Sequence, residues 1–381
     1  MVAGRLGLTS FGGPVAHLGY FRREYVERRG WLDDATFADL VALSQSLPGP
    51  ASSQLGFAIG LRRAGIVGGL AAWLGFTLPS AVALIVFGLL FASTDLSGAG
   101  WVHGLKLAAV AVVAQAVVVM AGRLATDWPR RAMAVVACVI ALVWQVPLAQ
   151  LAIILGAAVV GRLALEAPPP AGTTDGASPV SRRVGMVAGA LFIVLLVGLP
   201  LLRIVGGQAV ALVDAFYRSG ALVFGGGHVV LPLLHAAVVD PGWVSNDQFV
   251  AGYGAAQAVP GPLFTFAGYL GTVSSIAPNG AVGGAIGVAA IFLPGLLLLL
   301  AAMPFWHELR GWRSARSAFA GVNAAVVGIL AAALYTPVWT SAVTAPVDVL
   351  VAAAGFGLLL TGRMPPIVVV GLSALAGQLI A

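Results

Sequence analysis

The sequence predicts an all-α polytopic membrane protein, built as an inverted-topology repeat of two homologous units with discontinuous, re-entrant helices. Three observations predict this fold. Of the 381 residues, 60% are hydrophobic and only 9% are charged, against about a quarter charged in an ordinary soluble domain. Several apolar runs are long enough to cross a hydrocarbon core about 30 Å thick. Many residues also recur in the same order about 212 positions later. We therefore expect about 9–13 membrane segments.

The composition excludes several other classes of protein. The mean hydropathy is +0.99, and the 20 Lys and Arg residues exceed the 14 Asp and Glu residues. Positively charged cytoplasmic loops explain this excess, so no nucleic-acid partner is expected. The single cysteine, Cys138, lies in an apolar run, so it predicts packing and implies no disulfide, metal or other cofactor. The N-terminal apolar segment is short and interrupted by glycine, so a cleaved signal peptide is not expected.

Matched residues define the two units. Phe11 recurs as Phe224, and the Pro-Gly-Pro (PGP) motif at 48–50 recurs at 260–262. Further pairs are Trp31 with Trp243, Phe37 with Phe249, Gln45 with Gln257, Gly60 with Gly271, Pro79 with Pro294, and Gly104 with Gly321. The predicted organisation is a first unit at 1–165, a Pro-, Gly- and Ser-rich cytoplasmic linker at 166–183, a connecting transmembrane helix at 184–207, and a second, inverted unit at 208–381.

Loop charges predict that the two units have opposite orientations. The loop that follows the first Phe-Gly-Gly (FGG) motif contains Arg22, Arg23, Arg28 and Arg29, whereas its counterpart before Trp243 has no Lys or Arg. The loops that follow Pro79 and Pro294 show the reverse pattern. Because positive loops stay in the cytoplasm, this reversal is typical of inverted repeats. The N-terminus is then expected inside and the C-terminus outside.

Nine apolar runs are expected to be full crossings, and the FGG and PGP segments are expected to be broken hairpins that return to the side they entered. The crossings are 66–91, 104–120, 132–144, 148–160, 184–202, 281–303, 318–335, 347–361 and 367–380. This scheme places the arginine clusters inside the cell, in agreement with the positive-inside rule. Only Arg203 and Arg218 fall outside or within the membrane.

The breaks predict an anion-binding site. Proline cannot continue a helix, and irregular backbone at membrane depth persists only inside protein or beside water. The helix that starts at Pro50 would present free N–H groups and a positive dipole end beside the hydroxyls of Ser52 and Ser53, a suitable site for an anion. The candidate substrate-binding residues are Gly12, Gly13, His17, Gln45, Pro48, Gly49, Pro50, Ser52, Ser53, Lys106, Gly226, Gly227, His228, Gln257, Pro260, Gly261, Pro262 and Thr265.

Some of these residues have a second interpretation. Gly-rich membrane segments are often packing surfaces, but four breaks in two matched pairs favour a transport site. His17 and His228 are either ligand contacts or structural histidines with satisfied hydrogen bonds. Lys106 either snorkels to the interface or faces the anion path, and the polar residue at the matching position, Asn323, favours the second alternative.

Two carboxylates precede the first PGP motif. Glu24 and Asp39 are candidate ion-pair partners of nearby arginines, and a proton-carrying role is the weaker alternative. Arg22, Arg23, Arg62 and Arg63 are expected to anchor the topology, and they could also attract anions to a cytoplasmic entrance.

Long composite motifs resemble the two-domain form of the chromate ion transporter (CHR) family. They are SFGGPVAHLGYFRREYVERRGWL, ALSQSLPGPASSQLGFAIG, AWLGFTLPSA, ALVFGGGHVVLPLL and GWVSNDQFVAGYGAAQAVPGPLFTFAGYLG. The similarity runs over almost the whole chain. The resemblance implies chromate efflux and chromate resistance, with sulfate as the usual competitor.

The expected function is therefore export of chromate, a tetrahedral oxyanion, by a potential-driven secondary transporter that works by alternating access in the plasma membrane. Uptake or exchange of sulfate or another oxyanion stays open as an alternative. A membrane-embedded enzyme with His228 or His17 as base is disfavoured, since no carboxylate cluster or Ser/His pairing stands at a suggestive spacing. Nothing resembles a P-loop, so direct use of ATP is not expected. The expected partners are the oxyanion and the lipid bilayer; a homodimer, the direction of transport and proton coupling stay open.

Overall fold

The computed structural model describes residues 2–93, 98–144, 147–167, 178–224 and 226–380, and these residues contain helices and no strand. We call residues 1–165 and 208–381 the first half and the second half. The helices of the first half are α1 (Val2–Thr9), α2 (Gly13–Phe21), the π-helix η1 (Arg22–Arg28), α3 (Asp34–Ser46), α4 (Ala51–Ser93), α5 (Gly100–Leu124), α6 (Trp128–Val143) and α7 (Pro147–Ala164).

A long helix, α8 (Arg182–Leu202), connects the halves. The second half contains α9 (Gly207–Ala221), η2 (Gly227–Val229), α10 (Val230–Val238), α11 (Asn246–Gln257), η3 (Leu263–Thr265), α12 (Phe266–Val273), α13 (Gly280–Ala302), η4 (Met303–Phe305), α14 (Trp306–Leu309), α15 (Arg313–Ala333), η5 (Leu334–Trp339), α16 (Thr340–Ala342), α17 (Pro346–Leu360) and α18 (Pro366–Ile380). Of the predicted linker, residues 168–177 lie outside the described residues.

Each predicted crossing coincides with a helix, and the helices have the apolar surface that a bilayer requires. Among the described residues, five helical stretches are long and apolar enough to cross a membrane, and α17 and α18 are shorter apolar helices. Helix α8 leaves Met186, Val187, Ile193 and Val194 exposed. Side chains of this kind are favourable on a surface only where lipid covers them. The chain is therefore a polytopic, all-helical membrane protein.

Helix α4 is two helices joined by a sharp kink. Ala64 (φ −152°, ψ 33°) and Gly65 (φ 62°, ψ −157°) leave the helical conformation, and the values at Gly65 are open only to glycine. The chain therefore reverses direction, and its two arms pack closely: a Cβ on Gly60 would stand 2.3 Å from the carbonyl oxygen of Gly68. The matching positions of the second half make the same contact, since a Cβ on Gly271 would stand 2.2 Å from the oxygen of Gly283.

The two halves interlock. Helix α5 of the first half packs against α17 and α18, while α15 of the second half packs against α6 and α7. Glycines make both contacts close. A Cβ on Gly377 would lie 2.4 Å from the backbone nitrogen of Gly104, and a Cβ on Gly161 would lie 2.7 Å from the Cα of Gly321. Gly104 and Gly321 are a matched pair in the sequence, so matched positions make matched contacts.

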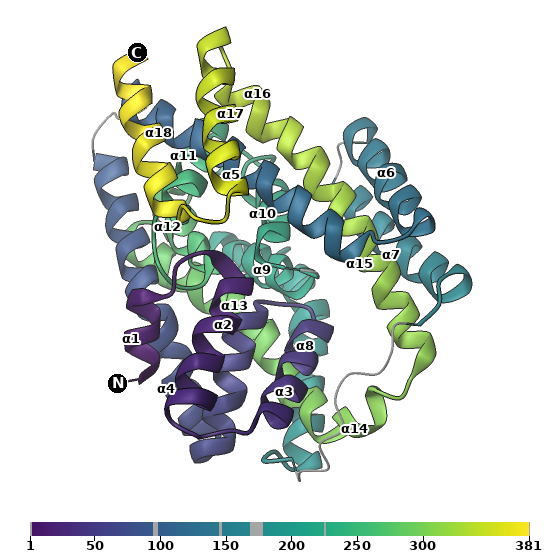
Figure 1. Cartoon of the computed structure of the whole chain (residues 1–381). Helices are drawn as coiled ribbons and strands as arrows, with labels where there is room; N and C mark the ends of the chain where they lie inside the picture. Colours follow the sequence, from purple (N-terminus) through teal and green to yellow (C-terminus); the bar gives the residue numbers. More distant parts are fainter. Residues whose placement is uncertain (1, 94–97, 145–146, 168–177, 225, 381) are drawn as a thin grey trace.

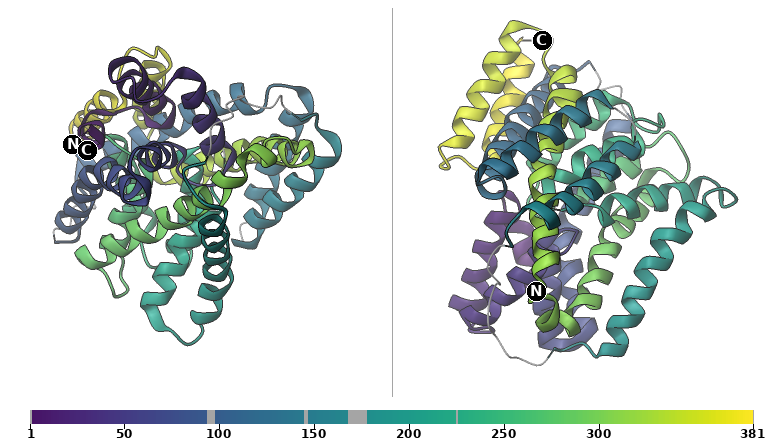
Figure 2. Two further views of the ribbon diagram at one scale, coloured as in Figure 1. Left: turned by 90° about the horizontal axis from the view of Figure 1, so that it is seen from below. Right: turned by 90° about the vertical axis from the view of Figure 1, so that its right-hand side faces the viewer.

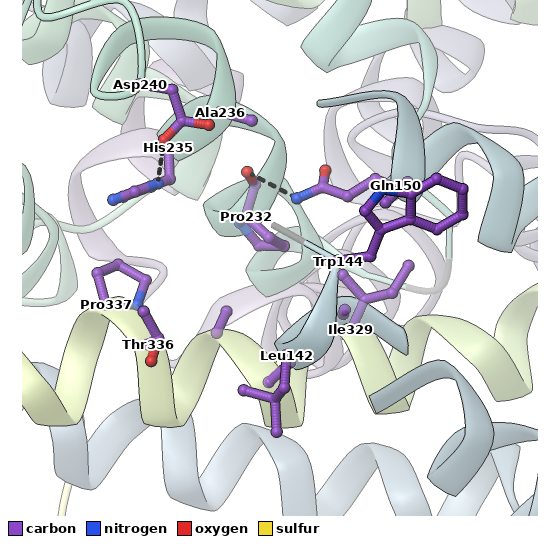
Figure 3. A pocket seen from close by; sticks show the side chains of 14 residues that line it. Leu142, Trp144, Gln150, Pro232, His235, Ala236, Asp240, Ile329, Thr336 and Pro337 are labelled. Carbon is purple, nitrogen blue, oxygen red and sulfur yellow. Dashed lines mark hydrogen bonds and ion pairs between the residues drawn. The ribbon is translucent and has the colours of Figure 1, made fainter. Parts of the chain in front are cut away.

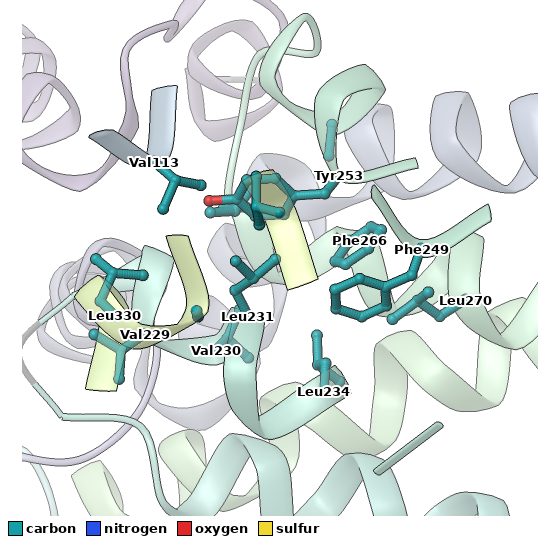
Figure 4. Packing of buried hydrophobic residues seen from close by; sticks show 14 of the residues in the cluster. Val113, Val229, Val230, Leu231, Leu234, Phe249, Tyr253, Phe266, Leu270 and Leu330 are labelled. Carbon is teal, nitrogen blue, oxygen red and sulfur yellow. The ribbon is translucent and has the colours of Figure 1, made fainter. Parts of the chain in front are cut away.

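The largest apolar cluster lies where α5 and α15 meet α10, α11 and α12, and it includes Val113, Leu231, Phe249, Phe266 and Leu330 (Figure 4). Away from this cluster, Arg22 and Arg310 pair with acidic residues of α3, and Arg182 pairs with Glu308 of α14. Helices α3 and α14 lie at one end of the molecule, and the C-terminus and the tip of α17 lie at the other (Figure 1). A side view shows the same separation between α1–α3 and α17–α18 (Figure 2). The site described next lies between these two ends.

Candidate functional site

Both FGG motifs and both PGP motifs interrupt helices, as the sequence predicts. Helix α1 ends at Thr9 and α2 begins at Gly13, while α3 ends at Ser46 and α4 begins at Ala51. The glycines of these breaks have positive φ values: 96° at Gly12, 75° at Gly13, 120° at Gly49, 143° at Gly226 and 107° at Gly261. Glycine alone adopts such angles without strain, so the motifs stop the helices where they stand.

Reciprocal hydrogen bonds join the breaks of one half to those of the other. The backbone N–H of Gly49 donates to the carbonyl of Val223 at 2.8 Å, and the N–H of Gly261 donates to the carbonyl of Ser10 at 2.9 Å. Ser10 and Val223 each immediately precede the phenylalanine of an FGG motif. Each PGP break is therefore bonded to the FGG break of the opposite half, and backbone donors that no helix uses are satisfied.

The PGP glycines also touch the proline-containing helices of the opposite half. A Cβ on Gly49 would stand 3.0 Å from the Cα of Gly295 in α13, and a Cβ on Gly261 would stand 2.8 Å from Ser80 Oγ in α4. The amide of Gln54, which is fully buried, donates to the carbonyls of Pro48 at 3.0 Å and Gly295 at 2.9 Å. These contacts bring Pro48, Gly49, Pro50, Pro260, Gly261 and Pro262 into one centre.

The two candidate histidines lie at this centre. A Cβ on Gly13 would stand 4.0 Å from His228 Nε2, so the two FGG breaks face one another. His17 is buried, and its Nε2–H donates to the carbonyl of Ser10 at 3.2 Å. The Nδ1 of His228 lies 2.7 Å from the hydroxyl of Tyr253. Gly227 begins the short helix η2 that carries His228.

The first turn of α4 differs from its counterpart in the second half. Ser52 and Ser53 are buried, and Ser53 Oγ has no hydrogen-bond partner. At the matching position, Thr265 is buried too, but its hydroxyl donates to the carbonyl of Pro262 at 2.7 Å. The start of α4 therefore has an unused hydroxyl that the second half lacks.

The two glutamines and the first glycine of FGG are less enclosed. Gln45 and Gly12 are exposed, and Gln257 is half-buried although its Nε2 atom is buried and unpartnered. The six segments that form the centre (10–17, 44–54, 72–81, 223–230, 253–265 and 287–296) contain no Lys, Arg, Asp or Glu. The site is thus polar, accessible in part and free of formal charge, so it can hold an anion without binding it too tightly.

Lys106 lies apart from the breaks. Its ammonium group pairs with Asp247 Oδ1 at 3.1 Å, and the side chain is largely buried. It borders a hollow that also contains His103 and Asp348, which pair at 2.8 Å. The structure therefore gives Lys106 a partner in the second half and does not bring it to the other candidates.

The two carboxylates before the first PGP motif pair with arginines. Glu24 accepts hydrogen bonds from Arg28 and Arg29 at 3.1 and 2.6 Å, and the bond from Arg29 is the main reason why the pKa of Glu24 lies below its usual value. Asp39 accepts from Trp306 Nε1 at 2.9 Å and pairs with Arg310 at 3.4 Å. Among the described residues, no group of three His, Cys, Asp or Glu could hold a metal ion.

Two further cavities are lined by described residues outside the predicted site. One, of about 140 Å³, lies between α6, α7, α10 and η5 and contains His235 and Asp240, which face one another at 3.3 Å (Figure 3). A second, of about 350 Å³, lies beside Asp39, Arg62 and Arg310 at the arginine-rich end.

Sequence reasoning missed Ser10, Gln54 and Tyr253. Gln54 and Tyr253 both lie inside the quoted motifs, PGPASSQ and GYGAAQ, so their position gave a signal. Ser10 also lies inside a quoted motif, SFGGP, but nothing in the sequence indicates that its carbonyl receives bonds from His17 and, across the repeat, from Gly261. Such contacts depend on how the halves pack.

Comparisons with known proteins agree with this architecture. A family profile described as chromate transporter matches residues 1–162 and again 210–378. A chromate transport protein of Pseudomonas aeruginosa is 29% identical, with the alignment covering 99% of this chain and 90% of that protein. One of Cupriavidus metallidurans is 28% identical over 91% and 83% of the two chains.

A probable chromate transport protein of Synechococcus elongatus is 28% identical over 87% of this chain and 81% of that protein. No solved structure matches the chain significantly. Because the profile matches span most of both halves, this chain belongs to the chromate transporter family.

Proposed function

We propose that this protein transports chromate or a related tetrahedral oxyanion across the bacterial plasma membrane, with the anion bound between the four breaks. Family membership and the names of its relatives support the substrate. The observation that carries the location is the pair of reciprocal hydrogen bonds, Gly49 to Val223 and Gly261 to Ser10. They join four helix interruptions into one uncharged, polar centre, whose accessible part includes Gly12 and Gln45.

The proposed topology is an inverted repeat in which each PGP segment is a re-entrant hairpin. Two contacts, one at the base of each hairpin, support it. The guanidinium of Arg63 lies 4.2 Å from the ring centre of Trp31, so the hairpin from residue 31 to residue 63 begins and ends at one place. In the second half, the N–H of Ser275 donates to the carbonyl of Trp243 at 2.8 Å. The matched residues Trp31 and Trp243 therefore join the two ends of matched hairpins. The loop charges predict that the two hairpins enter the membrane from opposite sides.

The proposed mechanism is alternating access. Since each PGP break bonds to the opposite half, movement of one half against the other changes the space between them without breaking the hydrogen bonds within a helix. Outward movement of one negative charge gains about 2.3 kcal/mol per 100 mV of inside-negative potential. Export of an oxyanion can therefore be driven by the membrane potential alone.

Everted membrane vesicles test this proposal. We expect vesicles that contain the protein to accumulate chromate when an inside-positive potential is imposed, and sulfate to inhibit this uptake. Pro48→Ala, Gly49→Leu and Ser52→Ala are expected to reduce uptake more than Arg28→Ala, because the Arg28 side chain is more than half exposed and pairs with Glu24 outside the breaks. Uptake no greater than that of empty vesicles would refute transport, and equal loss in all four variants would refute the site. Accumulation only by right-side-out vesicles would instead establish import.

A further inference from the structure

Buried polar atoms without a hydrogen-bond partner gather on the first-half side of the site. They are Ser10 Oγ, His17 Nδ1, Ser44 Oγ, Ser53 Oγ and Thr77 Oγ1. Each residue is at most 2% exposed. Buried polar groups are nearly always paired, so a group of unpaired ones calls for water, an ion or a ligand.

One of these residues, His17, contacts Phe76, and Ser10, Thr77 and Ser53 lie near this contact along the chain or through hydrogen bonds. The ring of Phe76 lies 5.3 Å from the ring of His17, which in turn bonds to Ser10. Thr77 follows Phe76 in α4. The contact of Gly60 with Gly68 sets the register of the two arms of α4, and in that register residue 53 lies level with residue 75, next to Phe76. Ser53 therefore lies beside the same region, in the first turn of a helix, whose N–H groups favour an anion.

The second half has lost or paired the corresponding groups. The matched positions of Ser10, Ser44 and Thr77 are Val223, Ala256 and Phe292, which have no hydroxyl. The hydroxyl of Thr265 is already bonded to Pro262. His228, unlike His17, uses its Nδ1 in the contact with Tyr253. Unpaired hydroxyls are thus concentrated on the first-half side of the proposed two-sided site, whereas the second half offers the unpartnered amide nitrogen of Gln257.

The protonation state of His17 decides whether the first-half side of the site attracts or repels an anion. Its Nε2 carries a hydrogen, because it donates to the Ser10 carbonyl. In the neutral ring, Nδ1 is then a bare acceptor, which would repel an anionic oxygen beside it. When Nδ1 takes up a proton it becomes a donor, and the imidazolium offsets one negative charge of the anion.

We propose, on the basis of the function proposed above, that the hydroxyls of Ser10, Ser53 and Thr77 bind the oxyanion and that it binds together with one proton, held by His17 Nδ1. The proton comes from water on the side from which the anion enters. Neutral imidazole, a proton and a doubly charged oxyanion become an imidazolium–oxyanion pair with one net negative charge. One elementary charge then accompanies each anion across the membrane instead of two.

The described neighbours of His17 are mostly uncharged. Phe76 of α4 and the backbone of Ser10 are uncharged, and His228 is the titratable side chain that faces the break from the second half. Four charged residues of η1, Arg22, Glu24, Glu27 and Arg28, form ion pairs with one another, with Asp34 or with Arg29. Arg62 and Arg63 lie at the kink of α4, at the far end of its first arm.

Sulfate binding to the purified full-length protein tests the proton, because sulfate itself stays fully ionised in the neutral range. We expect the apparent Kd of the wild type to rise about tenfold per pH unit on the alkaline side, between about pH 6 and about pH 8, since one proton is taken up. His17→Gln keeps a donor to the Ser10 carbonyl but cannot titrate, so its Kd should not vary with pH. His228→Gln should keep the wild-type slope.

Matched hydroxyl variants test the asymmetry. Ser53→Ala is expected to weaken sulfate binding tenfold or more, and Thr265→Ala less than threefold, with thermal melting measured to confirm that both variants fold. Equal weakening by the two variants, or a pH slope that survives in His17→Gln, would overturn the inference. A wild type that binds neither sulfate nor chromate at any pH would instead contradict the proposed function.

Discussion

Substitution of Gly49 by alanine should destabilise the protein and abolish most transport. Gly49 has φ 120°, where a side chain costs about 1–3 kcal/mol. Its Cβ would stand 3.0 Å from the Cα of Gly295 and 3.1 Å from Gln54 Nε2. The backbone of Gly295 cannot easily move, so Gln54 must swing away, and each hydrogen bond it loses costs about 0.5–1.5 kcal/mol. With both hydrogen bonds of Gln54 lost, the expected loss of unfolding free energy is about 2–6 kcal/mol.

Two other glycines serve as matched comparisons. Gly261→Ala should behave like Gly49→Ala, because φ is 107° and the new Cβ would meet Ser80 Oγ at 2.8 Å. Gly30 has φ 57° but nothing within 4 Å of its Cβ position, so Gly30→Ala should lose only the conformational cost, about 1–2 kcal/mol. Unfolding by SDS in mixed micelles measures the three losses, and vesicle uptake measures transport.

The three glycine variants test the close approach of α13 and the equivalence of the two PGP breaks. If Gly49→Ala is no less stable than Gly30→Ala and still transports chromate, the PGP break does not depend on the close approach of α13. If Gly49→Ala is destabilised but Gly261→Ala is not, the two breaks are not equivalent, and the reciprocal hydrogen bonds do not reflect a repeat.

Two further changes probe the interface between the halves. Gly377→Leu should disrupt the packing of α18 on α5, because even a Cβ there would lie 2.4 Å from the backbone nitrogen of Gly104. Gly357→Leu should be tolerated, since nothing lies within 4 Å of its Cβ position. The yield of monodisperse protein after detergent extraction measures the difference between the two variants. Asp39→Ala should lower the melting temperature, because it removes the acceptor of the half-buried indole N–H of Trp306 at a cost of about 0.5–1.5 kcal/mol. Asp34→Ala removes only an exposed ion pair and should change melting little.

Helix positions could be read from the sequence because they depend on local chemistry. Runs of apolar residues long enough for a bilayer predict crossings, and each predicted crossing coincides with a helix. The break positions follow from Pro and Gly for the same reason. The kink at Ala64 and Gly65 directly follows Arg62 and Arg63. These arginines were expected to lie in the loop between the first PGP hairpin and the crossing at 66–91.

Partnerships between distant segments could not be read in the same way. Lys106 seemed suited to an anion path because the residues next to it in the sequence are apolar. Its actual partner, Asp247, lies 141 residues away in the sequence. The same applies to the packing of α5 and α15, each against helices of the opposite half, and to the contact between Gly13 and His228. A periodic pattern specifies which face of a helix is buried, but it does not specify what buries it.

Comparison of the matched positions separates the scaffold from its chemistry. The residues that both halves share are those that fix backbone geometry: the PGP motifs, the prolines of α4 and α13, and the glycines at close contacts. The residues in which they differ are hydroxyl-bearing in the first half and apolar in the second, as Thr77 and Phe292 illustrate. Two identical ligand sets would offer a single small anion alternative positions on either side of the centre. In the proposed mechanism, a matched frame with one polar side would give the anion one position, while both halves would keep the matched shape that alternating movement requires.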